Sequence, residues 1–491
     1  MATWYEGSNL ILPGNALTTT PGDNVFVAAN VQVASTGGNT GIYAPAGGIN
    51  DAEIYGSVYG GYGIGTGPGG GNKIHVGAGG SVSGSLSGMF FGTGVDNYIS
   101  NAGEIAGSAG ITFNDAENTV INSGTINGTF NQALLFSKGG ANSIVNSGTI
   151  SAPDFYAIDI SSSQPIDGMD TIDNSGTIAA GGSWYAILTG DAAASITNSG
   201  HIAGGIDFGS GTNIYDGTLG SVKGTIYAGT GTNIFTGGAG IETFDLRNGT
   251  DTVDGGGGND TFQVNGNFAN VSIDGGTGTD TVVLAGDYSA GLVIKPEMMI
   301  NVEVLKLTMG NSYKLTTNDS VLAAGATLTI DGSALLAGDA LVFNGGKETN
   351  GHLKIIDGLG ADTFTVGSQS DKVIIASASD STSTHYDTVV GWNFGADKWN
   401  IPGGPGTITA IDTALATGTL STASFDANLT TAMTGHLAAH SAILFTPNAG
   451  TLSGQKFMVV DFNGTAGYQA GQDLVIRLQS STGTLAVGGF I

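Results

Sequence analysis

The sequence predicts an all-β protein, a right-handed parallel β-solenoid that continues into a glycine- and aspartate-rich coiled region and ends in a β-rich carboxyl-terminal domain. Two observations predict this class. A short motif containing Asn-Ser-Gly or Asn-Ala-Gly recurs about every 21 to 28 residues in the first half of the chain. Acidic residues recur every nine residues further on. Such periods are typical of coils that bury a core only when they stack on their neighbours.

Five units define the first repeat: "ISNAGEIAG", "VINSGTING", "IVNSGTISA", "IDNSGTIAA" and "ITNSGHIAG". Each indicates a β-branched strand, a bend and a second strand. Stacking predicts an asparagine ladder of side-chain hydrogen bonds, a corner glycine that adopts positive φ, and a buried isoleucine column. The asparagines are Asn101, Asn122, Asn146, Asn174 and Asn198; the glycines are Gly103, Gly124, Gly148, Gly176 and Gly200; the isoleucines are Ile105, Ile126, Ile150, Ile178 and Ile202.

Two further units, with Asn213 and Asn233, extend the expected solenoid over residues 25–236. Residues 1–24 precede the first recognisable coil, and we expect them to form a cap or an assembly arm. The amino end has no basic segment followed by an apolar run, which argues against a cleaved signal peptide. No stretch of about 18 apolar residues occurs, so we expect no membrane-spanning segment.

Composition excludes several classes of function. The chain has 40 Asp and Glu against 13 Lys and Arg, for a formal charge of −27. Nucleic-acid binding needs clustered basic residues, so we expect no nucleic-acid partner. An acidic surface needs counter-charge, which divalent cations held by oxygen ligands can supply. Cysteine is absent, so neither disulfides nor thiolate metal sites stabilise the fold.

The nine-residue series matches a Gly-Gly-x-Gly-x-Asp-x-hydrophobic-x pattern, in full at residues 255–263 and 275–283. It resembles the calcium-binding RTX repeats of proteins exported by type I secretion systems. The resemblance implies an RTX-like calcium-binding β-roll over residues 237–290 and a second RTX-like block with an aromatic cap over residues 351–402. Between them, residues 291–350 form a strand-rich insert.

Calcium prefers several hard oxygen ligands, and glycines let backbone carbonyls converge beside one carboxylate per turn. The resemblance therefore implies Ca²⁺ between successive turns. A metal-free solenoid with tight glycine turns is the alternative, and the aspartates directly before a glycine are either extra ligands or turn-favouring residues. The candidate ligands in these blocks are Glu242, Asp251, Asp254, Asp260, Asp274, Asp280, Asp357, Asp362 and Asp371.

Residues 403–491 are expected to form a carboxyl-terminal domain with an uncleaved secretion signal. Its segment "FMVVDFNGTAGYQAGQDLVIRL" places Asp461, Asn463 and Asp473 in an oxygen-rich loop between two strands. The segment is similar to the aspartate-rich loops of RTX and surface-layer carboxyl domains. A calcium site and an ordinary hairpin turn both fit this pattern.

These expectations favour a structural extracellular protein, a self-assembling surface-layer or matrix-fibre subunit that depends on calcium and is exported by type I secretion. Partners would be copies of the chain itself, with cell-surface polysaccharide or lipopolysaccharide as a further candidate. The alternatives are a calcium-dependent adhesin or carbohydrate binder and, less favoured, a polysaccharide lyase or hydrolase. We expect no enzyme activity, because no carboxylate pair with a basic residue emerges. An adhesin needs an exposed aromatic stripe, for which the candidates are Tyr55, Tyr59 and Tyr62.

Overall fold

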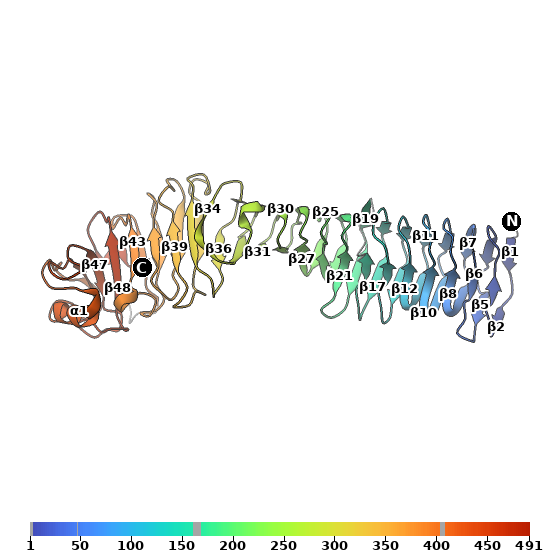
Figure 1. Cartoon of the computed structure of the whole chain (residues 1–491), viewed down its shortest axis with the longest axis horizontal. Coiled ribbons are helices and arrows are strands. Elements are labelled where there is room, and N and C mark those ends of the chain that lie inside the picture. Colours follow the sequence, from blue (N-terminus) through green and yellow to red (C-terminus); the bar gives the residue numbers. More distant parts are fainter. Residues whose placement is uncertain (1–2, 47, 161–167, 403–407) are drawn as a thin grey trace. The chain divides into compact units, whose positions relative to one another are not determined.

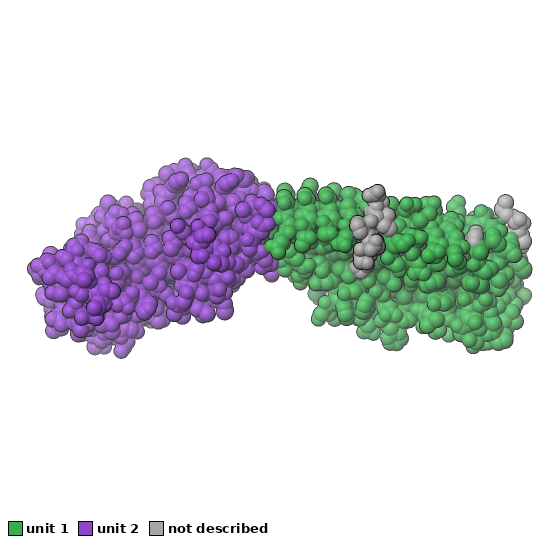
Figure 2. All heavy atoms as spheres, in the orientation of Figure 1, with its two compact units in different colours: residues 1–260 green, residues 261–491 purple. Residues whose placement is uncertain are grey.

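The computed structural model describes residues 3–46, 48–160, 168–402 and 408–491. The chain divides into two compact units, Met1–Asp260 and Thr261–Ile491 (Figure 2). In each unit, most strands pair in parallel with the strand one coil earlier and the strand one coil later. Figure 1 shows the stacked coils of unit 1 between β1 and β30. The predicted all-β parallel solenoid is therefore confirmed.

Unit 1 contains two sets of parallel strands that alternate along each coil. The first set consists of β1 Thr3–Glu6, β4 Asn24–Val27, β7 Asp51–Ile54, β9 Lys73–Val76, β11 Tyr98–Asn101, β13 Thr119–Asn122, β16 Ser143–Asn146, β19 Met169–Asn174, β22 Ala193–Asn198, β25 Thr212–Asp216, β28 Thr232–Thr236 and β30 Thr250–Asp254. The second set consists of β2 Leu10–Leu12, β3 Leu17–Thr18, β5 Gln32–Ser35, β6 Ile42–Ala44, β8 Ser57–Thr66, β10 Ser81–Phe91, β12 Glu104–Phe113, β14 Thr125–Gly128, β15 Leu134–Phe136, β17 Thr149–Ala152, β18 Ile158–Ile160, β20 Thr177–Ala180, β21 Tyr185–Thr189, β23 His201–Ala203, β24 Gly205–Asp207, β26 Ser221–Lys223, β27 Thr225–Ala228 and β29 Thr243–Leu246.

The isoleucine column forms as predicted. Ile105 pairs in register with Ile126, and the pairing continues through Ile150 and Ile178 to Ile202. All five side chains are fully buried. Because alternate residues of a strand face opposite sides, one inward isoleucine per coil builds a continuous core. Burial of each such side chain contributes about 1.5–3 kcal/mol.

The asparagine ladder also forms as predicted. The Nδ2 of Asn101 donates to Oδ1 of Asn122 at 2.7 Å, and the same bond recurs at 2.8 Å at each later step of the column. The amide is suited to this position because it donates and accepts at once. Each of the first four asparagines thus donates to the asparagine of the next rung, whereas Asn198 donates to the backbone carbonyl of Ser221 in the next rung.

The predicted reason for the corner glycines, a positive φ, was wrong. None of the five appears among the glycines with positive φ. They are needed because adjacent coils approach too closely for a side chain. A Cβ at Gly148 would lie 2.1 Å from the carbonyl oxygen of Gly124, and one at Gly176 would lie 2.2 Å from that of Gly148.

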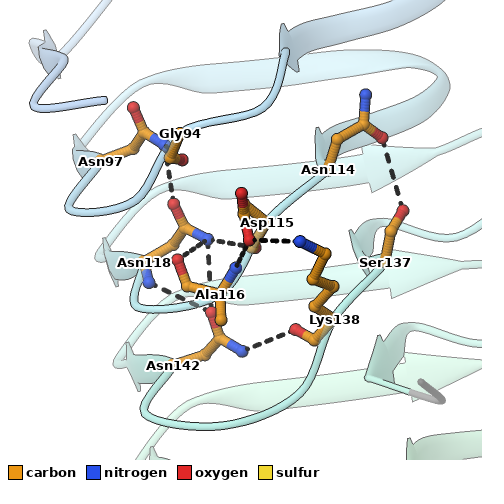
Figure 3. A network of polar contacts seen from close by, with 9 residues as sticks. All are labelled: Gly94, Asn97, Asn114, Asp115, Ala116, Asn118, Ser137, Lys138 and Asn142. Carbon is orange, nitrogen blue, oxygen red and sulfur yellow. Dashed lines mark hydrogen bonds and ion pairs between the residues drawn. The ribbon is translucent and has the colours of Figure 1, made fainter. Parts of the chain in front are cut away.

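A second asparagine column, which the sequence analysis missed, lies just before the first set of strands. Asn97 donates through Nδ2 to Oδ1 of Asn118 at 2.8 Å, and Asn118 donates to Oδ1 of Asn142 at 3.3 Å (Figure 3). Asn142 in turn donates to Oδ1 of Asp170 at 2.9 Å. The signal was an asparagine two residues before the inward apolar residue, as in Asn97-Tyr98-Ile99.

Unit 2 contains parallel coils in its first part and antiparallel strands near its carboxyl end. One set of strands consists of β31 Thr261–Asn265, β33 Thr281–Ala285, β36 Val304–Leu307, β38 Thr327–Asp331, β40 His352–Ile356, β42 Lys372–Ile374 and β44 Lys398–Asn400. β32 Val271–Asp274 and β35 Met299–Ile300 pair with each other in parallel. A nine-stranded sheet contains β34 Tyr288–Ile294, β37 Tyr313–Thr317, β39 Leu341–Asn344, β41 Thr363–Thr365, β43 Asp387–Val390, β48 Leu474–Gln479, β47 Lys456–Val460, β46 Ser441–Phe445 and β45 Ala410–Ile411.

The carboxyl-terminal strands turn antiparallel, since β46 pairs with β47 and β47 with β48. Helix α1 (Phe425–Met433) packs its buried residues into a core that includes Phe457 and Val475. Trp392 and Trp399 are fully buried, with ring centroids 4.0 Å apart. The remaining helical turns are η1 Phe268–Asn270, η2 Ser383–His385, η3 Thr422–Ser424 and η4 Val487–Gly489. Among the described residues, no helix has the length and apolarity to span a bilayer.

Candidate metal centre

Three of the predicted acids, Asp260, Asp362 and Asp371, share one structural position. Each lies at or directly before the start of a strand, and its carboxylate accepts a hydrogen bond from a backbone N–H of the preceding coil. The N–H of Glu242 donates to Oδ1 of Asp260 at 2.7 Å, and the N–H of Leu353 donates to Oδ1 of Asp371 at 2.8 Å. The carboxylate thus holds two coils together through one of its oxygens.

Three acids that the sequence analysis missed occupy the same position. The N–H of Asp280 donates to Oε2 of Glu303 at 2.7 Å, and the N–H of Asp371 donates to Oδ1 of Asp397 at 3.0 Å. The third is Asp387, which accepts from the N–H of Asp362 at 2.9 Å. The sequence signal was present, because these acids also stand two residues before a buried apolar side chain.

The glycines of the two complete repeats adopt the conformation that the repeat requires. Gly256 and Gly276 have φ of +86° and +88°, which only glycine adopts readily. Two residues before them, Asp254 and Asp274 accept hydrogen bonds from the N–H groups of Gly256 and Gly276, at 2.9 and 3.1 Å. These two aspartates therefore have a turn-forming role; Asp254 is exposed and Asp274 half-buried.

Three carboxylates meet in unit 2 and form what we call the acid trio: Asp357, Asp362 and Asp387. Asp357 follows β40, Asp362 precedes β41 and Asp387 opens β43. One carboxylate oxygen from each lies within 4.8 Å of the others. All three side chains are buried, with exposed fractions of 3% or less. In the part of the chain that the structure describes, this is the only such group of three potential metal-ligating side chains.

Four of the six carboxylate oxygens of the trio lack a hydrogen-bond donor. Neither oxygen of Asp357 accepts a hydrogen bond, and Oδ2 of Asp362 and Oδ2 of Asp387 accept none either. The other oxygen of Asp362 accepts from the N–H of Leu341 at 2.8 Å. Buried carboxylate oxygens without a donor are rare in proteins, because ionised groups lose their hydration on burial. This arrangement needs either protons or a cation.

Burial and mutual repulsion raise the pKa values in the trio. Burial, followed by the charges of Asp387 and Asp362, raises the pKa of Asp357 well above its usual range. Burial likewise raises the pKa of Asp362, and the negative charge of Asp380 raises it further. For Asp387, burial raises the pKa from 3.8 to about 8. Without a cation, the folded protein therefore retains protons here at neutral pH.

These residues fit a divalent cation. The unpartnered oxygens of Asp357, Asp362 and Asp387 converge, and hard oxygen ligands are those that calcium and magnesium prefer. Such an ion would supply the positive charge that no basic side chain supplies in this group. Two of the three aspartates, Asp357 and Asp362, were predicted as ligands from the sequence.

The predicted ligands in the first glycine block do not gather in the same way. Asp251 accepts from Nδ2 of Asn233 at 2.7 Å, while its Oδ2 is buried and accepts no hydrogen bond. Burial raises the pKa of Asp251 to about 6. Glu242 accepts from the N–H of Gly238 at 3.2 Å, and burial raises its pKa as well. Among the described residues, neither belongs to a cluster of three acids.

In the carboxyl-terminal loop, backbone donors occupy the carboxylates. Oδ1 of Asp461 accepts from the N–H groups of Gly464 and Thr465, and its Oδ2 accepts from that of His440 at 2.6 Å. Asp473 accepts from two further backbone N–H groups. Asn463 bonds to the side chains of Gln469 and Gln472. Of the two interpretations of this loop, the hydrogen bonds favour the hairpin turn.

The sequence was compared with protein-family models and with curated proteins. No protein-family model matches the chain, and no curated protein matches it significantly.

Proposed function

We propose that this chain is a structural extracellular protein, a self-assembling surface-layer or matrix-fibre subunit whose folding and assembly depend on calcium. The observation that carries the proposal is the acid trio, in which four buried carboxylate oxygens accept no hydrogen bond. Calcium bound by Asp357, Asp362 and Asp387 would join the loop after β40 to the coils that contain β41 and β43.

Mass action explains how such a site would control folding. A ligand that binds only the folded state raises the free energy of unfolding by RT ln(1 + [L]/Kd). Calcium is scarce in the cytosol and abundant outside cells, so the same chain would be less stable before export than after it. Self-repulsion of a chain with a formal charge of −27 strengthens this contrast. This is the behaviour expected of a type I secretion substrate.

The repeating architecture supports a structural role. Rung after rung of unit 1 is joined by side-chain amide ladders and a buried isoleucine column. Stacked coils of this kind form a rigid rod-like element that is stabilised by its neighbours. Such an element is suited to bearing load in a lattice or a fibre.

The test is to purify the full chain, then add and chelate calcium while its assembly is followed by light scattering and negative-stain microscopy. We expect ordered sheets or fibres with calcium that dissolve with chelator. The Asp357→Asn variant should need more calcium, whereas Asp254→Asn, which alters an exposed turn, should assemble normally. A monomer that is indifferent to calcium would overturn the proposal.

A further inference from the structure

Five aromatic side chains form a continuous row in unit 1, which we call the aromatic platform: Phe155, Tyr156, Trp184, Tyr185 and Tyr227. They lie in the turn before β18, at the start of β21 and in β27. The ring of Trp184 lies 4.7 Å from that of Phe155 and 5.1 Å from that of Tyr156. Tyr185 lies 6.2 Å from Tyr156 and 5.3 Å from Tyr227. The row is partly exposed, with 41% exposure at Trp184.

The row is continuous because the intervening coil has a glycine, Gly205, beside the Tyr185 ring. Tyr185 pairs in register with Gly205, which lies in the coil between Tyr185 and Tyr227. A Cβ at Gly205 would lie 3.2 Å from Cδ1 of Tyr185. Because this coil presents only hydrogen at that point, the Tyr185 ring extends across it and reaches Tyr227.

Polar groups border the rings. Asp207 pairs in register with Tyr227, which pairs with Asp245. The guanidinium of Arg247 lies 4.6 Å above the Tyr227 ring and bonds to Asp207 at 3.1 Å. Such a cation–π contact fixes the orientation of the ring. The platform therefore presents carboxylates and aromatic faces in alternation along neighbouring coils.

One carboxylate of these coils is buried and does not belong to the border. Asp159, in the coil that also carries Tyr156, is 5% exposed and accepts from Nε2 of Gln132 at 2.8 Å. Burial raises the pKa values of the Tyr156 and Tyr185 phenols, so both stay protonated at neutral pH. The surface thus offers hydroxyl donors and carboxylate acceptors beside the rings.

This chemistry matches a neutral sugar chain better than a protein or a polyanion. The C–H faces of a pyranose pack on aromatic rings, while its hydroxyls donate to carboxylates and accept from phenols. Protein interface cores are depleted in charged residues, whereas Asp207 and Asp245 border this surface. Acidic polysaccharides would be repelled by the same carboxylates and by the net charge.

We propose that the aromatic platform binds a linear neutral polysaccharide, with the sugar chain running across successive coils. Neighbouring coils are about 4.8 Å apart in a parallel stack, a spacing comparable to the length of one sugar unit in an extended chain. The site lies wholly in unit 1, and none of its residues belongs to the acid trio. It is therefore a binding function beyond the calcium-dependent assembly proposed above.

The tyrosines that the sequence analysis proposed as a stripe do not form one row. The ring of Tyr55 lies 5.8 Å from that of Phe26 and 6.0 Å from that of His75, whereas the ring of Tyr62 lies 4.9 Å from that of Phe90. The platform was missed because its members are spread over residues 155–227, and only the coil register brings them together.

The test is affinity electrophoresis of the full chain in native gels that contain hydroxyethyl cellulose, dextran, galactomannan or alginate. We expect retardation by at least one of the three neutral polymers, none by alginate, and little change with added salt. Trp184→Ala and Tyr185→Ala should each weaken the retarding interaction at least tenfold. Trp4→Ala is the matched control, because Trp4 is similarly exposed, at 38%, and lies outside the platform.

Far-ultraviolet circular dichroism of each variant controls for folding. The proposal is overturned if no neutral polymer retards the protein, or if folded Trp184→Ala is retarded like the wild type. It is also overturned if Trp184→Ala leaves sugar binding intact and instead reduces self-association in sedimentation velocity, which would identify the platform as a contact between copies. Loss of calcium-dependent assembly with retained retardation would contradict only the earlier proposal.

Discussion

The laddered coils of unit 1 and the acid-bearing coils of unit 2 use the same position of the chain in opposite ways. In unit 1, Asn118 stands two residues before an inward apolar residue, and its amide continues a ladder. In unit 2, Asp362 stands at the equivalent point before Phe364, and its carboxylate accepts one backbone N–H. One oxygen of Asp362 is left without a donor.

The two positions differ in one functional group, which is an amide in Asn118 and a carboxylate in Asp362. An amide both donates and accepts, so a column of amides satisfies itself from rung to rung. A carboxylate only accepts, so a column of carboxylates needs donors from outside the column. Asp170, where one ladder ends, obtains them from the N–H groups of Gly140 and Asn142. Four oxygens of the acid trio lack such donors, and calcium would supply the missing positive charge.

The largest effect expected of a single substitution comes from placing a carboxylate inside the ladder. Asn122 is fully buried, accepts from Asn101 and donates to Asn146. Asn122→Asp removes the donor and buries a charge, so it should lower the free energy of unfolding by about 3–5 kcal/mol. Urea denaturation measures this. Asn131→Asp, at an exposed site, should stay within about 0.5 kcal/mol of the wild type; equal effects in both variants would contradict the prediction.

Without calcium, stability should decrease as pH rises. The acids of the trio have pKa values raised in the folded state, from 3.8 to about 8 for Asp387. Between about pH 4 and pH 8 the folded state holds more protons than the unfolded state. The free energy of unfolding therefore falls by about 1.4 kcal/mol per pH unit for each retained proton. Denaturation in chelator from pH 4 to pH 8 checks this, and a profile that rises would show that the trio does not titrate in this way.

A carboxylate with donors on both oxygens should behave differently from the trio. Asp461 accepts three backbone N–H groups, so Asp461→Asn places an amide donor against one of them. We expect a loss of about 2 kcal/mol, equal with and without calcium. Denaturation in calcium and in chelator measures both values. A loss confined to the calcium-bound protein would instead identify this loop as a metal site.

The smallest expected effect is also the most specific. Asp357→Asn removes one charge from the trio, so calcium should bind at least tenfold more weakly, about 1.4 kcal/mol. The calcium-free protein should become more stable at neutral pH, because a neutral amide does not have to take up a proton on folding as the Asp357 carboxyl does. Calorimetric calcium titration and denaturation in chelator measure the two effects. Asp254→Asn should change neither, and a calcium-free variant less stable than the wild type would refute the account.

Local repetition made much of the fold predictable. The isoleucine column and the first asparagine ladder follow from a period that aligns equivalent residues. Asp357 and Asp362 could be selected because carboxylates beside glycines suit calcium. Asp387 could not be paired with them, since it lies 25 residues beyond Asp362 and joins them through the parallel pairing of β41 and β43.

The sequence by itself determined the coiled architecture and the chemistry available at each rung, because a repeat that buries one face only by stacking leaves few other folds. Tertiary structure decided how that chemistry is used. The distance between coils, not backbone φ, requires the corner glycines, and the stacking register decides which carboxylates lose their donors. The same register assembles the aromatic platform from residues that are remote in the chain. Such contacts depend on the summed lengths of the intervening coils, which no local pattern encodes.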